Sequence, residues 1–522
     1  MSALLLRNGW VFTNDPGKTI HEKADVLVVD SKISAIGADL SQQAAAYPDL
    51  KVIDAGNRLV LPGFVDAHMH SNEGFEMGRY DNLPLEIWLS EVYPPFHESG
   101  LDWRSKYLRA MLVGIASIRS GVTSLQDDVI NLGFKPDAVD ATASAYRDLG
   151  LRGWITASMW DESFCSSLPF LRDTMPADLV AALDALPLPG RDEQLALFRD
   201  LHGRWHDKDN IRIILGPCGP QRCSIELLEE VAALSQELDL PMHCHVLETR
   251  TQAVTGQQKY GRTLVQLLKD TGCLTHRLTM NHAVWLTDND IAMMGDAHCS
   301  ITHNPLANLK LGSGVAPVRE LLTAGVNVAL GCDGVASADT ADMFEAFKAA
   351  SMLHKIGTHD YRKWVSAHEV MEMATMAGAR SSLMQHQVGS LEIGKQADII
   401  LLDRKAWGLI PLHDPIQQIA FSAGSEAVRT SIIAGRVVME ERKLTLVDEE
   451  ALRDEISEAA ERFRRDECPQ MSRHAATVRP WLDQMYAKAT SGDIDLTPRV
   501  RRFPPVETGL RSRDALASGT NG

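Results

Sequence analysis

The chain has 522 residues, of which 45% are hydrophobic and 23% charged, a composition that excludes a largely disordered or fibrous protein. At about 150 residues per domain, this length predicts about three structural units. The formal net charge is −17, so an acidic surface would repel phosphate groups, and we expect neither nucleic acid nor membranes as partners. No apolar run reaches the ~18–20 residues of a membrane span. Eight scattered Cys without a CxxC pair, and no secretory signal pattern at the start, predict a cytoplasmic protein with reduced thiols.

The first 63 residues predict a small β unit. Short apolar runs alternate with turns, as in LLLRNGWVFTN and ADVLVVDSKISAIG. Residues 26–29 and 33–36 are expected to form two strands around a turn at residues 30–31. The unit ends near Gly63, where a more apolar pattern begins.

Residues 64–385 predict a (β/α)8 TIM barrel. Short, nearly continuous apolar runs recur, each followed by a helical pattern, which favours a parallel sheet covered by helices. The eight runs are FVDAHMH, VTSLQDD, LRGWITASMW, IRIILGPCG, LPMHCHVLE, RLTMNHAVWL, HCSITHNP and VNVALGCDG. Such a barrel takes about 250 residues, so this segment has room for insertions. The longest, at residues 161–191, is a lid or a plain surface loop.

A β pattern returns at residues 386–447, in GSLEIGKQADIILLD and VRTSIIAGRVVMEERKLTLVD. Neither this segment nor the N-terminal one has enough strands to bury a core, so we expect them to form one small β-sandwich together. Residues 448–522 are predicted to hold C-terminal helices and a tail, with Asp448 as the N-cap of an amphipathic helix. The polar residues 499–522 are expected to be mobile or to lie on a neighbour.

Two histidines end the first barrel strand. His68 and His70 in DAHMH are two residues apart, so on a strand they point to the same face and can share a metal ion. Taken alone, the pattern H-x-H is more often formed by two unrelated histidines than by a metal site. The other strand ends change that balance, because barrel enzymes build their sites at the carboxyl ends of the strands. Five of the eight predicted strands end in His or Asp, at His70, Asp127, His245, His282 and Asp333.

Two further strand ends offer ligands and a proton carrier. His245 is the candidate third nitrogen ligand, and Glu248 lies three residues further on, where a carboxylate can move a proton between water and a leaving group. The alternative for Glu248 is an acid at a helix N-terminus. Asp333 ends a strongly apolar run, where a buried charge needs a partner such as a metal ion. The alternative for Asp333 is a surface turn before Gly334.

In this order, these residues resemble the amidohydrolase superfamily, and most closely its branch of cytosine deaminases, triazine hydrolases and S-adenosylhomocysteine deaminases. The resemblance extends from about residue 20 to about residue 450. It rests on the stretches LPGFVDAHMH, DNLPLEIWL, GVTSLQDD, HCHVLET, NHAVWLTDNDI, THNPLANLKLGSGVAPV, GCDGVASADTADMF, GSLEIGKQADIILLD and VRTSIIAGRVV. It implies a barrel with a β-sandwich split between the two ends of the chain.

The resemblance also implies a role for each residue of the site. The implied metal ligands are His68, His70, His245 and Asp333. Glu248 becomes the proton shuttle, and Asp333 also orients the attacking water and accepts its proton. His282 contacts the substrate or leaving group and stabilises the charge that develops there.

The resemblance further implies a single metal ion. Two-metal members of the superfamily use a carboxylated Lys on the fourth strand, whereas IRIILGPCG has no Lys at its end and Lys208 precedes it. We therefore expect one divalent ion per subunit, Zn²⁺ by preference, with Fe²⁺ also compatible with His and carboxylate ligands. Cys332 stands where Thr is frequent, and Cys218, Gln221 and Arg222 stand where several relatives have His or Tyr, so the substrate stays open.

Other candidate site residues could instead have purely structural roles. Trp88 walls the pocket or lies in a helix core, and Gln221 reads polar groups of the substrate or lies in an exposed loop. His303 in THNP is expected near the site, as a substrate contact or a support for the ligands. Asp127 is expected to be a structural hydrogen-bond acceptor and His243 a packing residue.

The expected reaction is hydrolysis of a non-peptide C–N bond, with deamination of a cyclic amidine or amino-heteroaromatic compound by metal-activated water as the leading hypothesis. The same machinery could cleave an aryl urea, carbamate or amide, or remove chlorine from a triazine-like ring. A non-catalytic scaffold is the third alternative, and the complete set of expected ligands argues against it. The expected partner is a small-molecule substrate, and the resemblance implies a homo-oligomer.

Overall fold

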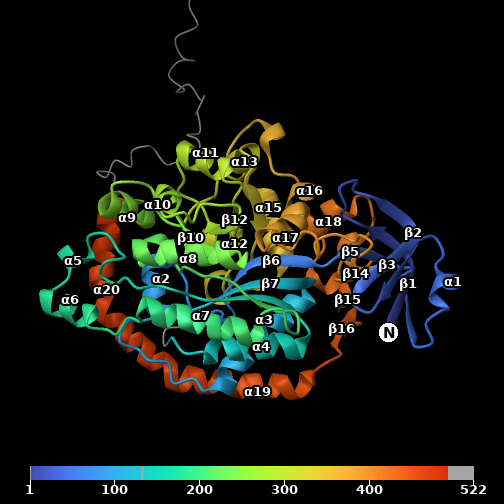
Figure 1. The fold of residues 1–522 in the computed structure, drawn as a ribbon, viewed down its shortest axis with the longest axis horizontal. Coiled ribbons are helices and arrows are strands. Elements are labelled where there is room, and N and C mark those ends of the chain that lie inside the picture. The colour runs from blue at the N-terminus through green and yellow to red at the C-terminus, as the bar shows by residue number, and fades with distance from the viewer. Residues whose placement is uncertain (1, 131–133, 492–522) are drawn as a thin grey trace, which may run out of the picture.

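The computed structural model describes residues 2–130 and 134–491 (Figure 1). The tail expected at residues 499–522 lies outside the described residues. Strands and helices alternate through the middle of the chain, and both ends of the chain contribute to a separate sheet at one side. Among the described residues, no helix combines the length and apolar character needed to cross a lipid bilayer.

Eight parallel strands form the central unit, and they are hydrogen bonded as two sheets of four. They are β6 (Phe64–Met69), β7 (Val122–Val129), β8 (Arg152–Ala157) and β9 (Ile211–Ile213) in one sheet, and β10 (Met242–Val246), β11 (Leu278–His282), β12 (Ser300–His303) and β13 (Asn327–Leu330) in the other. A parallel bridge between Leu215 and Met242 links the two sheets at one junction. At the other junction, the backbone N–H of Asp333 donates to the carbonyl of His68 at 2.9 Å. All eight predicted strands are therefore confirmed, and their closure into one ring stays a prediction.

Helices surround these strands (Figure 1). They include α3 (Trp103–Arg119), α4 (Asp137–Leu149), α7 (Arg191–Trp205), α8 (Ile225–Leu238), α9 (Arg250–Tyr260), α10 (Leu264–Asp270), α11 (Asp288–Asp296), α12 (Pro305–Lys310), α13 (Val318–Thr323), α15 (Met343–Leu353) and α16 (Ala367–Glu372). Every residue of β6, β7 and β8 is buried, as expected for parallel strands with both faces covered. These strands therefore form the buried centre of the unit.

The two ends of the chain share one nine-stranded sheet. Its strands are β1 (Ala3–Phe12), β2 (Ile20–Val29), β3 (Lys32–Gly37), β4 (Leu50–Asp54), β5 (Arg58–Pro62), β14 (Ile399–Asp403), β15 (Val428–Ile433), β16 (Arg436–Glu440) and β17 (Lys443–Leu444). The halves join where β5 pairs antiparallel with β14, with Val60 opposite Leu401. This pairing confirms that the two segments build one sheet, and the two-layered sandwich stays a prediction.

A buried ion pair fastens this sheet to the barrel strands. Arg152 in β8 donates from Nε and Nη2 to the two carboxylate oxygens of Asp398, at 2.9 and 3.0 Å. Asp398 also accepts the backbone N–H of Ala434 at 2.8 Å. This bidentate pairing gives both buried charges hydrogen-bond partners. A buried charge without such a partner would destabilise the fold.

The C-terminal helices run along the outside of the barrel (Figure 1). Helix α19 (Glu449–Arg462) begins at Asp448, whose side chain accepts the backbone N–H of Ala451, as the sequence predicts. A π-helical turn at Phe463–Glu467 then leads into α20 (Cys468–Thr490). Helix α20 reaches the mouth of the barrel, where Arg250 donates to the carbonyl of Ala489 at 3.0 Å.

The longest insertion is a folded cap, not an open loop. It contains the short helices α5 (Leu171–Thr174) and α6 (Ala177–Asp184). Its buried Leu171, Met175 and Leu183 share one apolar cluster with residues of α20. Helix α2 (Leu85–Val92) contributes Ile87 to the same cluster, so the cap, α2 and α20 support one another beside the strand ends.

Candidate metal centre and active site

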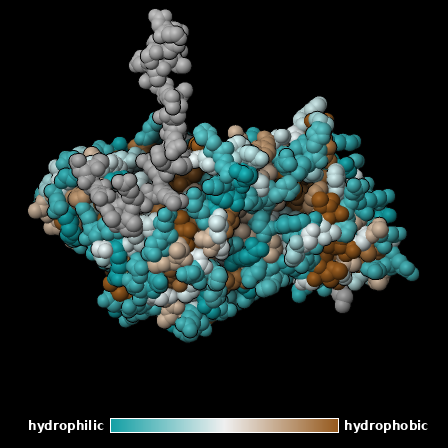
Figure 2. Space-filling view, turned by 90° about the horizontal axis from the view of Figure 1, so that it is seen from above, coloured by the Kyte–Doolittle hydropathy of each residue, from teal (hydrophilic) through white to brown (hydrophobic). Residues whose placement is uncertain are grey.

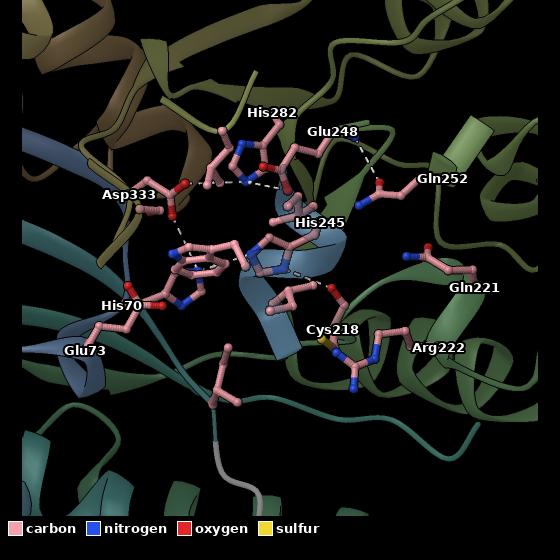
Figure 3. A pocket seen from close by; sticks show the side chains of 16 residues that line it. His70, Glu73, Cys218, Gln221, Arg222, His245, Glu248, Gln252, His282 and Asp333 are labelled. Carbon is pink, nitrogen blue, oxygen red and sulfur yellow. Dashed lines mark hydrogen bonds and ion pairs between the residues drawn. The ribbon is translucent and has the colours of Figure 1, made fainter. Parts of the chain in front are cut away.

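Four candidate ligands from three parts of the chain converge at the strand ends, and Figure 3 shows three of them, His70, His245 and Asp333. His68 lies in β6, His70 directly follows it, His245 lies in β10 and Asp333 follows β13. The Nε2 atoms of His70 and His245 are 3.2 Å apart. Asp333 Oδ1 lies 3.3 Å from His68 Nε2 and 3.5 Å from His70 Nε2. Ligand atoms about 2.0–2.1 Å from a tetrahedral ion lie about 3.3 Å from one another, so this spacing fits a metal ion.

The imidazole rings are fixed by hydrogen bonds on their far side. The Nδ1 atom of His68 contacts His243 Nε2 at 2.8 Å, that of His70 contacts the carbonyl of Asp128 at 2.7 Å, and that of His245 contacts the carbonyl of Cys218 at 2.9 Å. Partners of this kind orient histidines that bind metals. The Nε2 of His68 is buried without a hydrogen-bond partner, which is costly unless something is bound there. These histidines therefore present Nε2 to one common point.

The backbone conformation and the negative charge of Asp333 both suit a metal ligand. Its φ angle is +68°, in a region that residues other than glycine rarely adopt and that concentrates at functional sites. Burial disfavours the Asp333 carboxylate, yet the imidazoles of His68, His282 and His70 outweigh burial and hold its pKa well below the ordinary value. Asp333 is thus ionised at neutral pH, and it supplies the negative charge of the cluster.

Glu248 faces the same cavity from the loop after β10. Its backbone N–H donates to Gln252 Oε1 at 2.9 Å, which fixes the start of α9. Its Oε2 lies 3.6 Å from His282 Nε2. Burial raises the pKa of Glu248 well above its ordinary value, and the nearby carboxylates of Asp333 and Glu86 raise it further. A buried carboxyl group whose pKa is raised in this way is suited to proton transfer.

His282 lies at the end of β11, between Glu248 and Asp333. Its Nε2 is 3.9 Å from Asp333 Oδ2, and its Nδ1 contacts Asn308 Oδ1 at 2.9 Å. Its φ angle is +73°, a second strained position at a strand end. With Nδ1 held by Asn308, Nε2 faces the space above the ligand cluster.

The cluster forms the floor of a pocket of about 560 Å³ that is partly open to solvent (Figure 3). Its walls include the apolar side chains of Leu85, Leu89 and Leu311. Trp88 lines this pocket and is only 4% exposed, with its indole N–H donated to the carbonyl of Ala336. Gln221 lines the pocket as well, so both of these positions predicted from the sequence border it.

His303 lies beside the strand ends, and its expected role as a substrate contact or a support for the ligands stays a prediction. In the part of the chain that the structure describes, His303 does not line the pocket, and its Nε2 contacts His354 Nε2 at 3.0 Å. The reason is its place in β12, where the side chain points towards α15. Asp127 accepts the backbone N–H of Ser71 at 3.0 Å and the hydroxyl of Tyr146 at 2.6 Å, which confirms a structural acceptor.

Sequence reasoning missed three buried groups beside the site. His243 is a hydrogen-bond partner of His68 and not a packing residue, and its position two residues before His245 was the available signal. Asp128 lies 3.7 Å from the Nδ1 of His245. Glu73 lines the pocket and accepts hydrogen bonds from the Tyr93 hydroxyl at 2.8 Å and the Ala336 backbone N–H at 3.1 Å. Only its spacing of three residues from His70 could have drawn attention to Glu73.

The contact between His243 and His68 gives a testable consequence. We expect His243→Ala to weaken metal binding by about 10–100-fold, because His68 loses the partner that orients its ring. Competition against a chromophoric chelator measures the affinity. The matched control is His276→Ala at an exposed position, and equal affinities in the two variants would show that His243 does not support the site.

Protonation of His70 predicts a pH-dependent metal affinity. Burial lowers the pKa of His70, but the carboxylates of Glu73, Asp333 and Asp128 outweigh burial and raise the pKa to about 9. In the metal-free protein His70 is therefore protonated at neutral pH and must lose that proton to bind a metal ion. We expect metal affinity to rise about tenfold per pH unit from pH 7 towards about 9. Calorimetry in buffers of different ionisation enthalpy should detect about one released proton at pH 7, and an affinity that does not change with pH would contradict this account.

The fold and this cluster define a class of proteins, the metal-dependent hydrolases that build their site at the strand ends of a barrel. Residues 59–438 match the sequence profile of the Amidohydrolase family. The chain belongs to the amidohydrolase family. It is a hydrolase that acts on carbon–nitrogen bonds other than peptide bonds, and its fold is a TIM barrel with an extra domain.

Two relatives match this chain over nearly the whole of their own length. The 5'-deoxyadenosine deaminase of Methanosarcina mazei is 32% identical over 465 residues, which are 88% of this chain and 98% of the relative. The 5-methylthioadenosine/S-adenosylhomocysteine deaminase of Caldanaerobacter subterraneus is 32% identical over 469 residues, which are 89% of this chain and 99% of the relative.

Solved structures agree with this assignment. A zinc-bound adenosine deaminase from Xanthomonas campestris superposes with a TM-score of 0.77 at 28% identity, covering 88% of this chain and 98% of that one. Atrazine chlorohydrolase from Arthrobacter aurescens, also complexed with zinc, gives 0.79 at 26% identity, covering 88% and 100%. A divalent metal site in this chain follows from these neighbours together with its own His-rich cluster.

Proposed function

We propose that this protein is a zinc-dependent deaminase of an amino-heteroaromatic ring, of the kind found in adenine nucleosides. One observation supports it above the others. Four ligand-type atoms spaced for a single metal ion lie beside a protonatable Glu248 and a fixed His282, at the floor of a partly open pocket. We choose deamination over other C–N hydrolyses because the relatives are named as deaminases.

The proposed metal ligands are His68, His70, His245 and Asp333; the three histidines form one group of close ligand atoms, and Asp333 lies in a second group with His68 and His282. Three neutral imidazoles and one carboxylate suit Zn²⁺, and Fe²⁺ remains a second option that metal analysis distinguishes. When bound, the ion supplies Lewis acidity and lowers the pKa of water from 15.7 towards about 7. No Lys lines the described pocket, which favours one ion over a Lys-bridged pair.

The protein's own residues would then move the protons. Asp333, ionised and next to His282, accepts the proton of the attacking water and orients that water towards the ring carbon. Glu248 donates its proton to the departing amino nitrogen, which leaves as ammonia. The Nδ1–H of His282 is already donated to Asn308 Oδ1, so its Nε2 first receives the water proton from Asp333, and the resulting imidazolium stabilises the charge that develops at the tetrahedral carbon.

The pocket walls favour a flat, mainly apolar ring. Trp88 and the leucines of α2 supply apolar contacts on one side. Gln221, Arg222 and Gln252, which lie near one another (Figure 3), offer hydrogen-bond donors and acceptors for ring nitrogens or substituents. Few placed polar groups in an otherwise apolar cleft are typical of sites that bind heteroaromatic molecules.

A leaving-group assay tests this function. Purified zinc-loaded protein is incubated with aminopurines, aminopyrimidines, aminotriazines, a chlorotriazine, aryl ureas and carbamates, and ammonia, amine, chloride and carboxylate are measured. We expect ammonia from an aminopurine or a related ring. Chloride from the triazine would favour the activity named for the solved chlorohydrolase, and amine or carboxylate release would favour urea, carbamate or amide hydrolysis.

We further propose a homo-oligomer in the cytoplasm, with domains dividing near residues 63, 385 and 447. All eight cysteines are free thiols, and seven of them are buried, as suits a reducing compartment. Hydrophobic side chains gather on the surface towards the end that holds the extra sheet (Figure 2), and Trp407 is 89% exposed. Light scattering coupled to gel filtration tests the association, and a particle with the mass of one chain would contradict it.

A further inference from the structure

A buried hydroxyl group contacts the proposed proton donor. Ser313 is only 4% exposed, and its Oγ–H donates to Glu248 Oε1 at 3.4 Å. Within the described part of the chain, no other side chain donates a hydrogen bond to this carboxyl group. Glu248 lines the active-site pocket, whereas Ser313 is not among the described residues that line it. Ser313 therefore touches Glu248 but not the space in which a substrate would bind.

The two carboxyl oxygens of Glu248 have different surroundings. Oε1 accepts the hydroxyl of Ser313, and Oε2 lies 3.6 Å from His282 Nε2 (Figure 3). The last torsion of a glutamate side chain has broad preferences, so the covalent structure alone does not decide which oxygen faces a neighbour. Because a hydroxyl donates to Oε1, Oε2 is the oxygen that can carry the proton of the neutral carboxyl group.

Ser313 is itself held on both sides by hydrogen bonds of its backbone. Its N–H donates to the carbonyl of Asn308 at 2.9 Å, and its carbonyl accepts the indole N–H of Trp285 at 2.9 Å. The chain then turns at Gly314, whose φ angle is +123°, and a Cβ there would lie 3.0 Å from Val284 Cγ1. Ser313 therefore has a fixed backbone from which its hydroxyl reaches Glu248.

The partners of Ser313 also hold the two proposed proton carriers. Asn308 Oδ1 contacts His282 Nδ1 at 2.9 Å. The backbone N–H of Trp285 donates to the carbonyl of Leu247, directly before Glu248, at 2.8 Å. The segment that carries Ser313 is thus tied through Asn308 to His282 and through Trp285 to the loop of Glu248. These shared contacts set the distance between the Ser313 hydroxyl and the carboxyl group.

We propose that Ser313 is a positioning residue for Glu248, whose hydroxyl holds Oε1 so that Oε2 delivers the proton to the departing nitrogen. This inference rests on the proposed function. In this step the bond between Oε2 and its proton breaks, a new N–H bond forms, and the electron pair of the C–N bond leaves with the nitrogen. Ser313 keeps its own proton throughout. A displacement of about 1 Å in a reacting group can cost about 100-fold in rate, so such support matters.

Ser313→Ala removes the hydroxyl and little else. With a compound that the leaving-group assay shows to be hydrolysed, we expect kcat to fall about tenfold, because a hydrogen bond to the proton donor is lost. We expect KM to stay within about twofold, because Ser313 does not line the described pocket. A loss that appears in KM alone would overturn the proposal.

The matched control is Ser382→Ala. Ser382 is a buried serine directly after α17 (Gly378–Ser381), and its hydroxyl donates to the carbonyl of Ala379 at 3.2 Å. It does not line the pocket described, so kcat should stay within about twofold. Metal content and thermal melting of both serine variants check that the fold is retained. An equal loss of kcat in both variants would overturn a specific role of Ser313.

A double-mutant cycle shows whether Ser313 acts through Glu248. In protein that already carries Glu248→Gln, we expect Ser313→Ala to change kcat by less than about twofold, because the proton that Ser313 positions is gone. Independent effects would multiply instead. A further tenfold loss in the Glu248→Gln background would therefore overturn the proposal.

Crystals of zinc-loaded Ser313→Ala test the orientation of Glu248 without any turnover. We expect the Glu248 carboxyl group to turn away from His282 or to occupy two conformations. A carboxyl group that keeps its place would overturn the positioning role. If no compound releases ammonia, the proposed deamination fails, and the position of Glu248 in these crystals still decides the role of Ser313.

Discussion

Replacing Glu248 with Gln is expected to lower kcat by about 10³-fold, with the metal content unchanged. The amide keeps the size of the side chain and the hydrogen bond of its backbone N–H to Gln252. It removes the titratable proton whose binding to Glu248 is favoured by burial and by the neighbouring carboxylates, which raise the pKa of this group. Because the departing nitrogen would then leave without a proton, the loss should appear in kcat and not in substrate binding.

The measurement compares kcat, KM and metal content of the variant with those of Glu76→Gln. Glu76 is also buried, but it pairs with Arg79 and does not line the pocket as described. We expect this control to keep kcat within a fewfold of the unchanged protein. If Glu248→Gln turned over as fast as the control, Glu248 could not be the proton donor.

The second large effect is expected for Asp333→Asn. Asn keeps the shape but lacks the charge, while three imidazoles still converge on the same point. Both metal affinity and proton transfer from water depend on this carboxylate, so we expect at least a 10³-fold loss of activity and metal occupancy below about one-tenth of an equivalent after dialysis against a chelator.

Asp127→Asn is the matched control for that variant. Asp127 is a buried carboxylate at a neighbouring strand end, but it bonds Ser71 and Tyr146 and does not line the pocket described. We expect the metal content of this control and its rate of ammonia release to be close to those of the unchanged protein. Full metal occupancy in Asp333→Asn would remove Asp333 from the ligand set.

Much of the site could be predicted from the sequence because its residues end apolar strands. The carboxyl ends of parallel strands meet at one edge, so His70, His245, His282 and Asp333 had to come close once the strands were identified. The joining of the two chain ends in one sheet could also be predicted, because each end alone has too few strands to bury a core.

Other parts of the site depend on contacts that periodicity does not encode. The bond between His243 and His68 joins two strands that are distant in sequence, and only side-chain packing decides that it forms. The positive φ angles of His282 and Asp333 are imposed by the surrounding structure against local preference. The insertion became a cap because α20, almost three hundred residues further on, buries its leucines.

His303 shows that a strand-end motif does not by itself give the direction of a side chain. The motif THNP follows a barrel strand in the sequence and therefore resembled a pocket residue. Its ring instead contacts His354 of the segment after α15, behind the strand ends. A strand-end position brings a residue near the site, but the direction of the side chain decides whether it reaches the substrate.

The central claim is that one divalent ion is held by His68, His70, His245 and Asp333. Crystals of zinc-loaded protein, with diffraction recorded above and below the zinc absorption edge, test it most directly. The account predicts one anomalous peak per chain, about 2.0–2.2 Å from the Nε2 atoms of the three histidines and from Oδ1 of Asp333. A peak at another place, a second peak beside the first, or no peak in protein that releases ammonia would contradict it.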